Sequence, residues 1–166
     1  VWSTYKKAFP ATENSTIVRV VAQQFVWNIH YPGRDGLFGK TDPAKIDDSN
    51  PLGLDMSDTA ARDDIVTVNQ LHFPVNKPVI AHLSSKDVIH SFAIPVLRVK
   101  QDTIPGMSIP VWFQATQTGE YEIACAQLCG VGHTLMRGFV TIDTPEQYEA
   151  WMAEQVSQLQ PPILTP

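Results

Sequence analysis

Residues 120–143 read EYEIACAQLCGVGHTLMRGFVTID, and this stretch indicates both the fold and the chemistry of the chain. Apolar side chains alternate with glutamates at its start, which predicts a β-strand over residues 121–125 with one buried face. A second strand is expected over residues 138–143. Between the two strands lies a loop that carries two cysteines, a histidine and a methionine within twelve residues.

Strand signals recur along the chain before this stretch. Residues 16–31 are rich in β-branched and aromatic side chains, as expected for a pair of strands with both faces partly covered. Further short strands, separated by turn residues, are predicted over residues 65–73, 78–84, 88–94 and 109–115. Many short strands with regular turns favour an all-β fold, an antiparallel sandwich or barrel.

The composition excludes several classes of protein. The chain has 166 residues, of which 43% are hydrophobic and 17% charged, which suits one globular domain and is too apolar for intrinsic disorder. The net charge is −5 and no basic stripe is present, so nucleic-acid binding is not expected. No apolar run reaches the roughly 18 residues of a transmembrane helix, and no signal peptide is evident at the start.

Three segments flank the predicted sandwich, which we place at residues 16–144. Residues 1–15 contain aromatic and basic side chains typical of the membrane-proximal end of a spanning segment. Residues 145–159 have one apolar face and follow Thr144, a suitable N-cap, which predicts a helix. Residues 160–166 hold three prolines and have the composition of a linker.

Residues 33–64 form an acidic insertion within the sandwich. They hold eight of the eleven aspartates and only four basic residues, so nearly all of the net charge lies there. Long loops of this kind are often functional. A merely solvated insertion and an acidic docking surface for a basic partner both fit this composition.

The loop at residues 125–136 carries Cys125, Cys129, His133 and Met136. Thiolate and thioether are soft donors that favour copper when imidazole joins them, whereas a thioether adds little for zinc. One cysteine, one methionine and two histidines make a mononuclear blue copper site. The second cysteine, four residues further along, allows both sulfurs to bridge a pair of metal ions.

A second histidine has to come from another part of the chain. His90 is the best candidate, because it lies at the predicted start of a strand. His30 lies at the end of its strand, while His72 and His82 lie inside strand runs, where histidines are more often structural. Asp87, three residues before His90, either orients the histidine through a hydrogen bond or only forms the turn.

Three other interpretations of the cysteines stay open. A disulfide between Cys125 and Cys129 would close a very small loop and gain little chain entropy. A structural zinc site built from the two cysteines and two histidines leaves Met136 unexplained. A nucleophilic cysteine acting with His133 needs an orienting group and an oxyanion site, and nothing in the sequence marks them.

Three segments resemble cytochrome c oxidase subunit II, namely DVIHSFAIP at residues 87–95, KQDTIPG at residues 100–106 and the loop at residues 125–136. The similarity extends from residue 24 to about residue 151. It implies a cupredoxin-like Greek-key β-barrel that carries the copper A centre. It also places the domain at the outer face of the bacterial cytoplasmic membrane, held by N-terminal transmembrane helices that this sequence does not include.

The resemblance implies a binuclear copper site with six ligand residues: His90, Cys125, Gln127, Cys129, His133 and Met136. The two thiolates bridge the coppers. His90 and the weak ligand Met136 complete one copper. His133 and the backbone carbonyl of Gln127 complete the other.

Two positions depart from the family pattern. Gln127 stands where the family usually has glutamate, whose carboxylate helps to hold magnesium at the contact with subunit I. The sequence therefore gives magnesium binding no clear support. Phe25 stands where the family generally has the tryptophan proposed to receive electrons from cytochrome c. Electron input is then expected at Phe25, at Trp27 or through the copper loop.

The function implied by the resemblance is electron transfer in the respiratory chain. Cytochrome c, or a haem c domain tethered through the tail, would reduce the copper pair, which would reduce the haem of subunit I. Only the assembled, proton-pumping oxidase would be an enzyme, and the isolated domain would be an electron carrier. A mononuclear cupredoxin, the copper domain of a nitrous oxide reductase and a copper-delivery protein remain alternatives.

Overall fold

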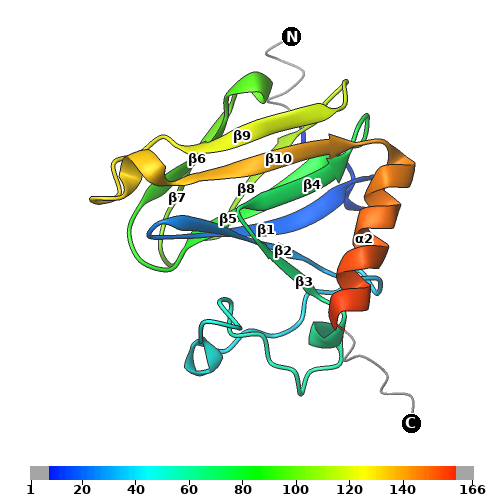
Figure 1. The fold of residues 1–166 in the computed structure, drawn as a ribbon, viewed down its shortest axis with the longest axis horizontal. Coiled ribbons are helices and arrows are strands. Elements are labelled where there is room, and N and C mark those ends of the chain that lie inside the picture. Colours follow the sequence, from blue (N-terminus) through cyan, green and yellow to red (C-terminus); the bar gives the residue numbers. More distant parts are fainter. Residues whose placement is uncertain (1–7, 160–166) are drawn as a thin grey trace.

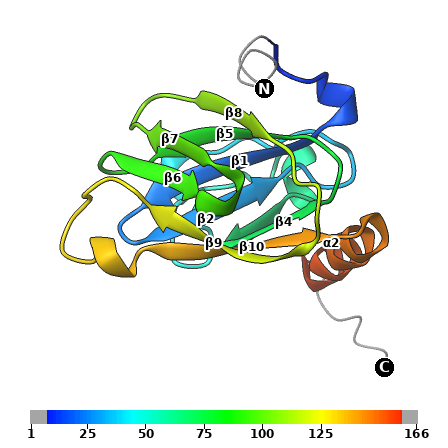
Figure 2. The same ribbon diagram turned by 90° about the horizontal axis from the view of Figure 1, so that it is seen from above.

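The computed structural model describes residues 8–159, in which two five-stranded sheets pack face to face (Figures 1 and 2). The strands are β1 (Thr16–Gln23), β2 (Val26–Tyr31), β3 (Ile65–Val68), β4 (Gln70–Pro74), β5 (Val79–Ser85), β6 (His90–Ile94), β7 (Val99–Thr103), β8 (Ile109–Phe113), β9 (Gly119–Cys125) and β10 (Arg137–Asp143). Helix α2 (Pro145–Leu159) follows β10. The predicted tail and the first seven residues of the predicted membrane-proximal segment lie outside the described residues.

The two sheets have the strand orders β3-β2-β1-β5-β8 and β4-β10-β9-β6-β7. The all-β prediction is confirmed, but the expectation of purely antiparallel pairing is wrong at two places. β1 pairs with β5 in parallel, and β4 pairs with β10 in parallel. Parallel neighbours need a long connection. Here the chain makes one by crossing to the other sheet before it returns.

The segment predicted as one strand over residues 65–73 is divided between the two sheets. Asn69 separates β3 from β4 and has a positive φ of 59°, a conformation that asparagine tolerates better than most residues. Its side-chain Oδ1 accepts a hydrogen bond from the backbone N–H of Trp27 at 2.8 Å. The strand β7 was not predicted, because its sequence VKQDT is mostly polar.

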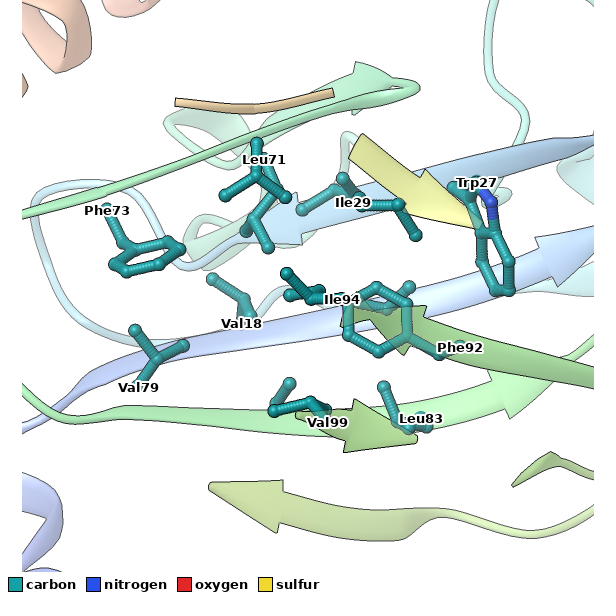
Figure 3. Packing of buried hydrophobic residues seen from close by; sticks show 14 of the residues in the cluster. Val18, Trp27, Ile29, Leu71, Phe73, Val79, Leu83, Phe92, Ile94 and Val99 are labelled. Carbon is teal, nitrogen blue, oxygen red and sulfur yellow. The ribbon is translucent and has the colours of Figure 1, made fainter. Parts of the chain in front are cut away.

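The core lies between the facing surfaces of the sheets, and Figure 3 shows part of it. Along β1 the buried and partly exposed residues alternate without interruption, as a strand with one core face requires. Trp27 and Phe92 are both fully buried and meet edge to face, with ring centroids 5.5 Å apart. Trp27 also contacts the His90 ring, at 6.2 Å between centroids. The aromatic core therefore extends to His90, one of the predicted metal residues.

Helix α2 closes one end of the sandwich. Thr144 caps it as predicted: its Oγ1 accepts from the Gln147 N–H at 3.2 Å, and Gln147 Oε1 accepts from the Thr144 N–H at 2.9 Å. Trp151 stacks on the His72 ring at 4.3 Å. The loop between β9 and β10 lies at the other end of the sandwich (Figures 1 and 2). Among residues 8–159 the structure contains no helix both long and apolar enough to cross a bilayer.

The acidic insertion at residues 33–64 contains two short 3₁₀ turns (Pro43–Lys45 and Ala60–Arg62) and is fixed to the sandwich at its end. Asp64 is 2% exposed and lies 2.7 Å from His30 Nε2. The same carboxyl group accepts the Gly39 N–H at 2.8 Å. Asp64 therefore links the insertion to the sandwich from a buried position, whereas the exposed Asp35 and Asp47 accept hydrogen bonds only within their own turns.

Candidate metal centre

The predicted metal residues come from two neighbouring strands and one loop. Cys125 is the last residue of β9, and His90 is the first residue of the adjacent strand β6. The Ala126 N–H donates to the carbonyl of Ser91 at 2.9 Å, which holds the start of the loop against β6. The loop then forms a short 3₁₀ turn (His133–Leu135) before β10 begins. The pairing of β6 with β9 within one sheet thus brings distant parts of the sequence to one end of the molecule.

The two thiols lie side by side, each with one imidazole nearby. The Sγ atoms of Cys125 and Cys129 are 3.7 Å apart. Cys125 Sγ lies 4.0 Å from His90 Nδ1, and Cys129 Sγ lies 3.7 Å from His133 Nδ1. Two ligands at about 2.2 Å from one ion, at a tetrahedral angle, are about 3.6 Å apart. These separations therefore suit donors that share a metal ion.

The last two predicted donors complete the group. Met136 Sδ is 3.8 Å from Cys129 Sγ, and the Gln127 carbonyl oxygen is 3.1 Å from Cys125 Sγ. Met136 is 2% exposed, so its thioether faces the site rather than solvent. The structure brings all six predicted residues together, and their two thiols, two imidazoles, thioether and carbonyl form a soft donor set that fits copper.

The surroundings affect the Cys129 thiol before any metal binds. Burial, together with the neighbouring Cys125 thiol, raises the pKa of the Cys129 thiol to about 11. Cys129 is therefore protonated at neutral pH in the metal-free protein. A metal ion has to displace this proton, because only the thiolate is a good ligand.

Asp87 orients the His90 ring. Its Oδ1 lies 2.8 Å from His90 Nε2. Burial raises the pKa of the Asp87 carboxyl, but the hydrogen bonds that it accepts, from the Gln24 N–H and from His90 above all, outweigh burial and lower that pKa. An ionised carboxylate can only accept, so Nε2 carries the proton and Nδ1 offers its lone pair toward Cys125. Asp87 also accepts the Val88 N–H, at 2.7 Å, and so forms the turn as well.

The other histidines lie away from the donor group. His30 is buried against Asp64, and His72 pairs with Asp143 at 2.9 Å and stacks on the helix. Burial lowers the pKa of His82, with a contribution from Arg19 beside it on the sheet. The sequence-based choice of His90 over these three agrees with the geometry.

The two residues predicted for electron input occupy different environments. Trp27 is fully buried, because its position on β2 turns this side chain into the core against Phe92. Electron input through Trp27 stays a prediction. Phe25 is half-buried and lies against the backbone of the metal loop at Gly130 and Gly132.

The metal loop presents an apolar, uncharged tip. Leu128, Val131 and Leu135 are 77%, 102% and 79% exposed. Such a group of exposed apolar side chains is typical of an interaction surface. Part of the acidic insertion lies near this end of the molecule, since Lys86, beside Asp87, donates to the Pro51 carbonyl at 2.6 Å.

One residue of the site was missed in the sequence. Gln24 donates from its side-chain Nε2 to the carbonyl of Cys129 at 2.6 Å. It stands next to Phe25 in the turn between two predicted strands, and a polar residue in a turn carries no signal of its own.

Comparison with known proteins assigns the family. Residues 16–142 match the model of the family described as cytochrome c oxidase subunit II, periplasmic domain. This chain belongs to that family. Its fold resembles the crystal structure of the periplasmic domain of oxidase subunit II from Bradyrhizobium japonicum, with a TM-score of 0.67 and 26% identity over 92% of this chain and 100% of that one.

Curated relatives carry the same family name. The chain is 39% identical over 143 residues to the alternative cytochrome c oxidase subunit 2 of Bradyrhizobium diazoefficiens, covering 86% of this chain and 52% of the relative. It is 31% identical over 152 residues to cytochrome c oxidase subunit 2 of Cereibacter sphaeroides, covering 86% and 50%. This subunit II domain therefore spans about half the length of these relatives.

A second solved structure shows a related domain with a partner. It is described as a mixed disulfide intermediate between a thioredoxin-like protein and subunit II of cytochrome c oxidase. This chain matches it with a TM-score of 0.65 and 26% identity, over 93% of this chain and 99% of that one.

Proposed function

We propose that this subunit II domain holds a binuclear copper A centre and carries electrons from cytochrome c, or from a tethered haem c domain, to the haem of oxidase subunit I. The observation that supports this most directly is the pair of thiols 3.7 Å apart, each with one imidazole nitrogen within 4.0 Å. A mononuclear blue copper site needs only one of these thiols, whereas two copper ions can use both as bridges.

The protein residues hold the site in one geometry. The thiolates of Cys125 and Cys129 would bridge the ions, and His90, His133, Met136 and the Gln127 carbonyl would complete them. Copper bound in this way supplies a one-electron carrier whose charge is shared over two ions. Because Cys125 and His90 belong to paired strands and Asp87 fixes the imidazole, the ligands move little when the charge changes. Little movement favours fast electron transfer.

The proposal also says where the domain lies in the cell and how it meets its redox partners. The domain would face the periplasm at the outer surface of the cytoplasmic membrane, anchored by transmembrane helices, as one subunit of a proton-pumping oxidase. The exposed apolar tip at Leu128, Val131 and Leu135 suits close contact with a redox partner near the metal ligands. The acidic insertion would guide a basic partner toward that tip.

Copper reconstitution tests the proposal. The domain is first treated with a dithiol reductant, because a related domain forms a mixed disulfide with a thioredoxin-like protein. We expect about two coppers per chain and an electron paramagnetic resonance spectrum with hyperfine structure from one electron shared by two nuclei. One copper with a mononuclear pattern would contradict the binuclear centre and favour a mononuclear carrier or a copper-delivery protein.

We also predict that aspartates near the metal end accelerate docking. Asp47 and Asp48 are exposed and lie close in the chain to Pro51, which contacts Lys86 beside the site. The double variant D47N/D48N should slow reduction by a basic cytochrome c by about threefold at 0.01 M salt and by little at about 1 M, because salt screens exposed charges. Stopped-flow reduction measures this.

The matched control for this prediction is D35N. Asp35 is also exposed, but the residues on either side of it line the cleft beside helix α2, at the opposite end of the sandwich. D35N should leave the rate almost unchanged. Slowing by D35N in proportion to the one charge that it removes, against two in D47N/D48N, would show that only the net charge matters.

A further inference from the structure

The turn between β1 and β2 lies against the metal loop, although 105 positions separate Gln24 from Cys129. The Gln24 side chain is largely exposed, yet its Nε2 donates to the Cys129 carbonyl at 2.6 Å. A carbonyl oxygen can only accept, so the amide nitrogen must face the loop. Gln24 thus holds the backbone of a residue whose thiol is in the donor group.

The backbone of Gln24 reaches the other half of the site. Its N–H donates to Asp87 Oδ2 at 2.7 Å, while Asp87 Oδ1 lies 2.8 Å from His90 Nε2. His90, Asp87, Gln24 and Cys129 therefore form one continuous hydrogen-bonded path. This path joins the imidazole at the start of β6 to the backbone carbonyl of Cys129 in the middle of the loop.

Close backbone approach supports the same contact. A Cβ atom at Gly130 would lie 2.7 Å from Gln24 Nε2, and one at Gly132 would lie 2.5 Å from the Phe25 ring. Real Cβ atoms do not come so close, so both positions need glycine as the chain stands. The loop therefore lies on the turn more tightly than residues with side chains would permit.

We propose that Gln24 is a positioning residue that fixes the spacing between the His90 and Cys129 ligands before copper binds. This inference rests on the proposed copper function. The Cys129 side chain is buried, but its neighbours Leu128 and Val131 are mostly exposed, so their packing adds little to the placement of the loop backbone. The hydrogen bond from the turn to the Cys129 carbonyl therefore adds to the packing that holds this residue.

Two variants of Gln24 test this proposal. Q24L removes the donor at similar size, and Q24E keeps the length but, when ionised, has no proton to donate. The matched control is Q114L, because Gln114 Nε2 also donates to a backbone carbonyl, that of Asn76, at 2.9 Å in another part of the sandwich. Because Gln24 is exposed, both variants should fold, and thermal unfolding of the metal-free proteins verifies it.

Copper release to a chelator and the copper spectra are the first readouts. Q24L and Q24E should each release copper about tenfold faster than the wild type, as expected when an acceptor loses its partner. Their hyperfine splitting should also change, which a general loss of stability would not cause. Q114L should match the wild type. Release within about twofold of the wild type, with unchanged spectra, would overturn the proposal.

Amide hydrogen exchange of the metal-free proteins gives a readout that does not depend on copper. The N–H groups of His133, Leu135 and Met136, which bond within the loop, should exchange about tenfold faster in Q24L than in the wild type or Q114L. Unchanged exchange would overturn the role of Gln24 even if copper binds as proposed. If the wild type fails to bind two coppers while exchange still responds, the copper function fails and the role of Gln24 in the loop stands.

Discussion

Replacing Cys129 by serine should abolish the shared-electron spectrum and reduce copper from about two ions to about one per chain. Cys129 is central to the donor group, because its Sγ lies within 3.8 Å of three other donor atoms, those of Cys125, His133 and Met136. A hydroxyl is a harder donor than a thiolate and does not bridge two coppers in its place. The variant therefore loses the bridge rather than one terminal ligand.

The matched control is M136L, which removes the thioether at similar volume. Met136 is expected to be a weak ligand, so M136L should keep two coppers and the shared hyperfine pattern, with a shifted reduction potential. Metal analysis, paramagnetic resonance and voltammetry on C129S, M136L and the wild type separate these effects. A C129S variant that still holds two coppers with a shared electron would contradict the bridging role.

The sequence was sufficient to select the candidate donors that the structure brings together, because most of them are local. Four donor side chains lie within twelve residues, so their spacing alone brings them near one another on one loop. His90 was chosen for its place at the start of a strand, and the structure pairs that strand, β6, with β9 so that Phe92 lies opposite Cys125. Alternation and runs of β-branched residues predicted most strands, whereas the N-cap Thr144 and an apolar face predicted the helix.

What the sequence did not reveal depends on contacts between distant segments. Alternation marks which residues share a face of a strand but does not show which face is buried, so it did not place Trp27 in the core. The same limit applies to the parallel pairing of β1 with β5, which depends on the path of the chain between the sheets. The contact between Gln24 and Cys129 spans 105 positions, and no local pattern encodes it.

The second large effect is expected at Asp64, which fixes the acidic insertion to the sandwich. D64A should lower the free energy of unfolding by about 3 kcal/mol, because it leaves a buried imidazole and a buried backbone N–H without their acceptor. His30 is 1% exposed and lies 2.7 Å from the carboxyl group, and the Gly39 N–H bonds to the same oxygen at 2.8 Å. A loss of this size is a large fraction of the 5–15 kcal/mol that is typical for a domain.

Urea denaturation of the metal-free domain measures this loss, with D48A as the control. Asp48 belongs to the same insertion but is exposed, so D48A should change stability by less than about 0.5 kcal/mol. The double variant H30L/D64L should be more stable than D64A, because it removes the buried imidazole together with its partner and leaves only the Gly39 N–H unpaired. If D64A and D48A are equally stable, the buried pair does not hold the insertion. Other contacts, such as the hydrogen bond from Lys86 to the Pro51 carbonyl, would then hold the acidic residues near the metal end in place.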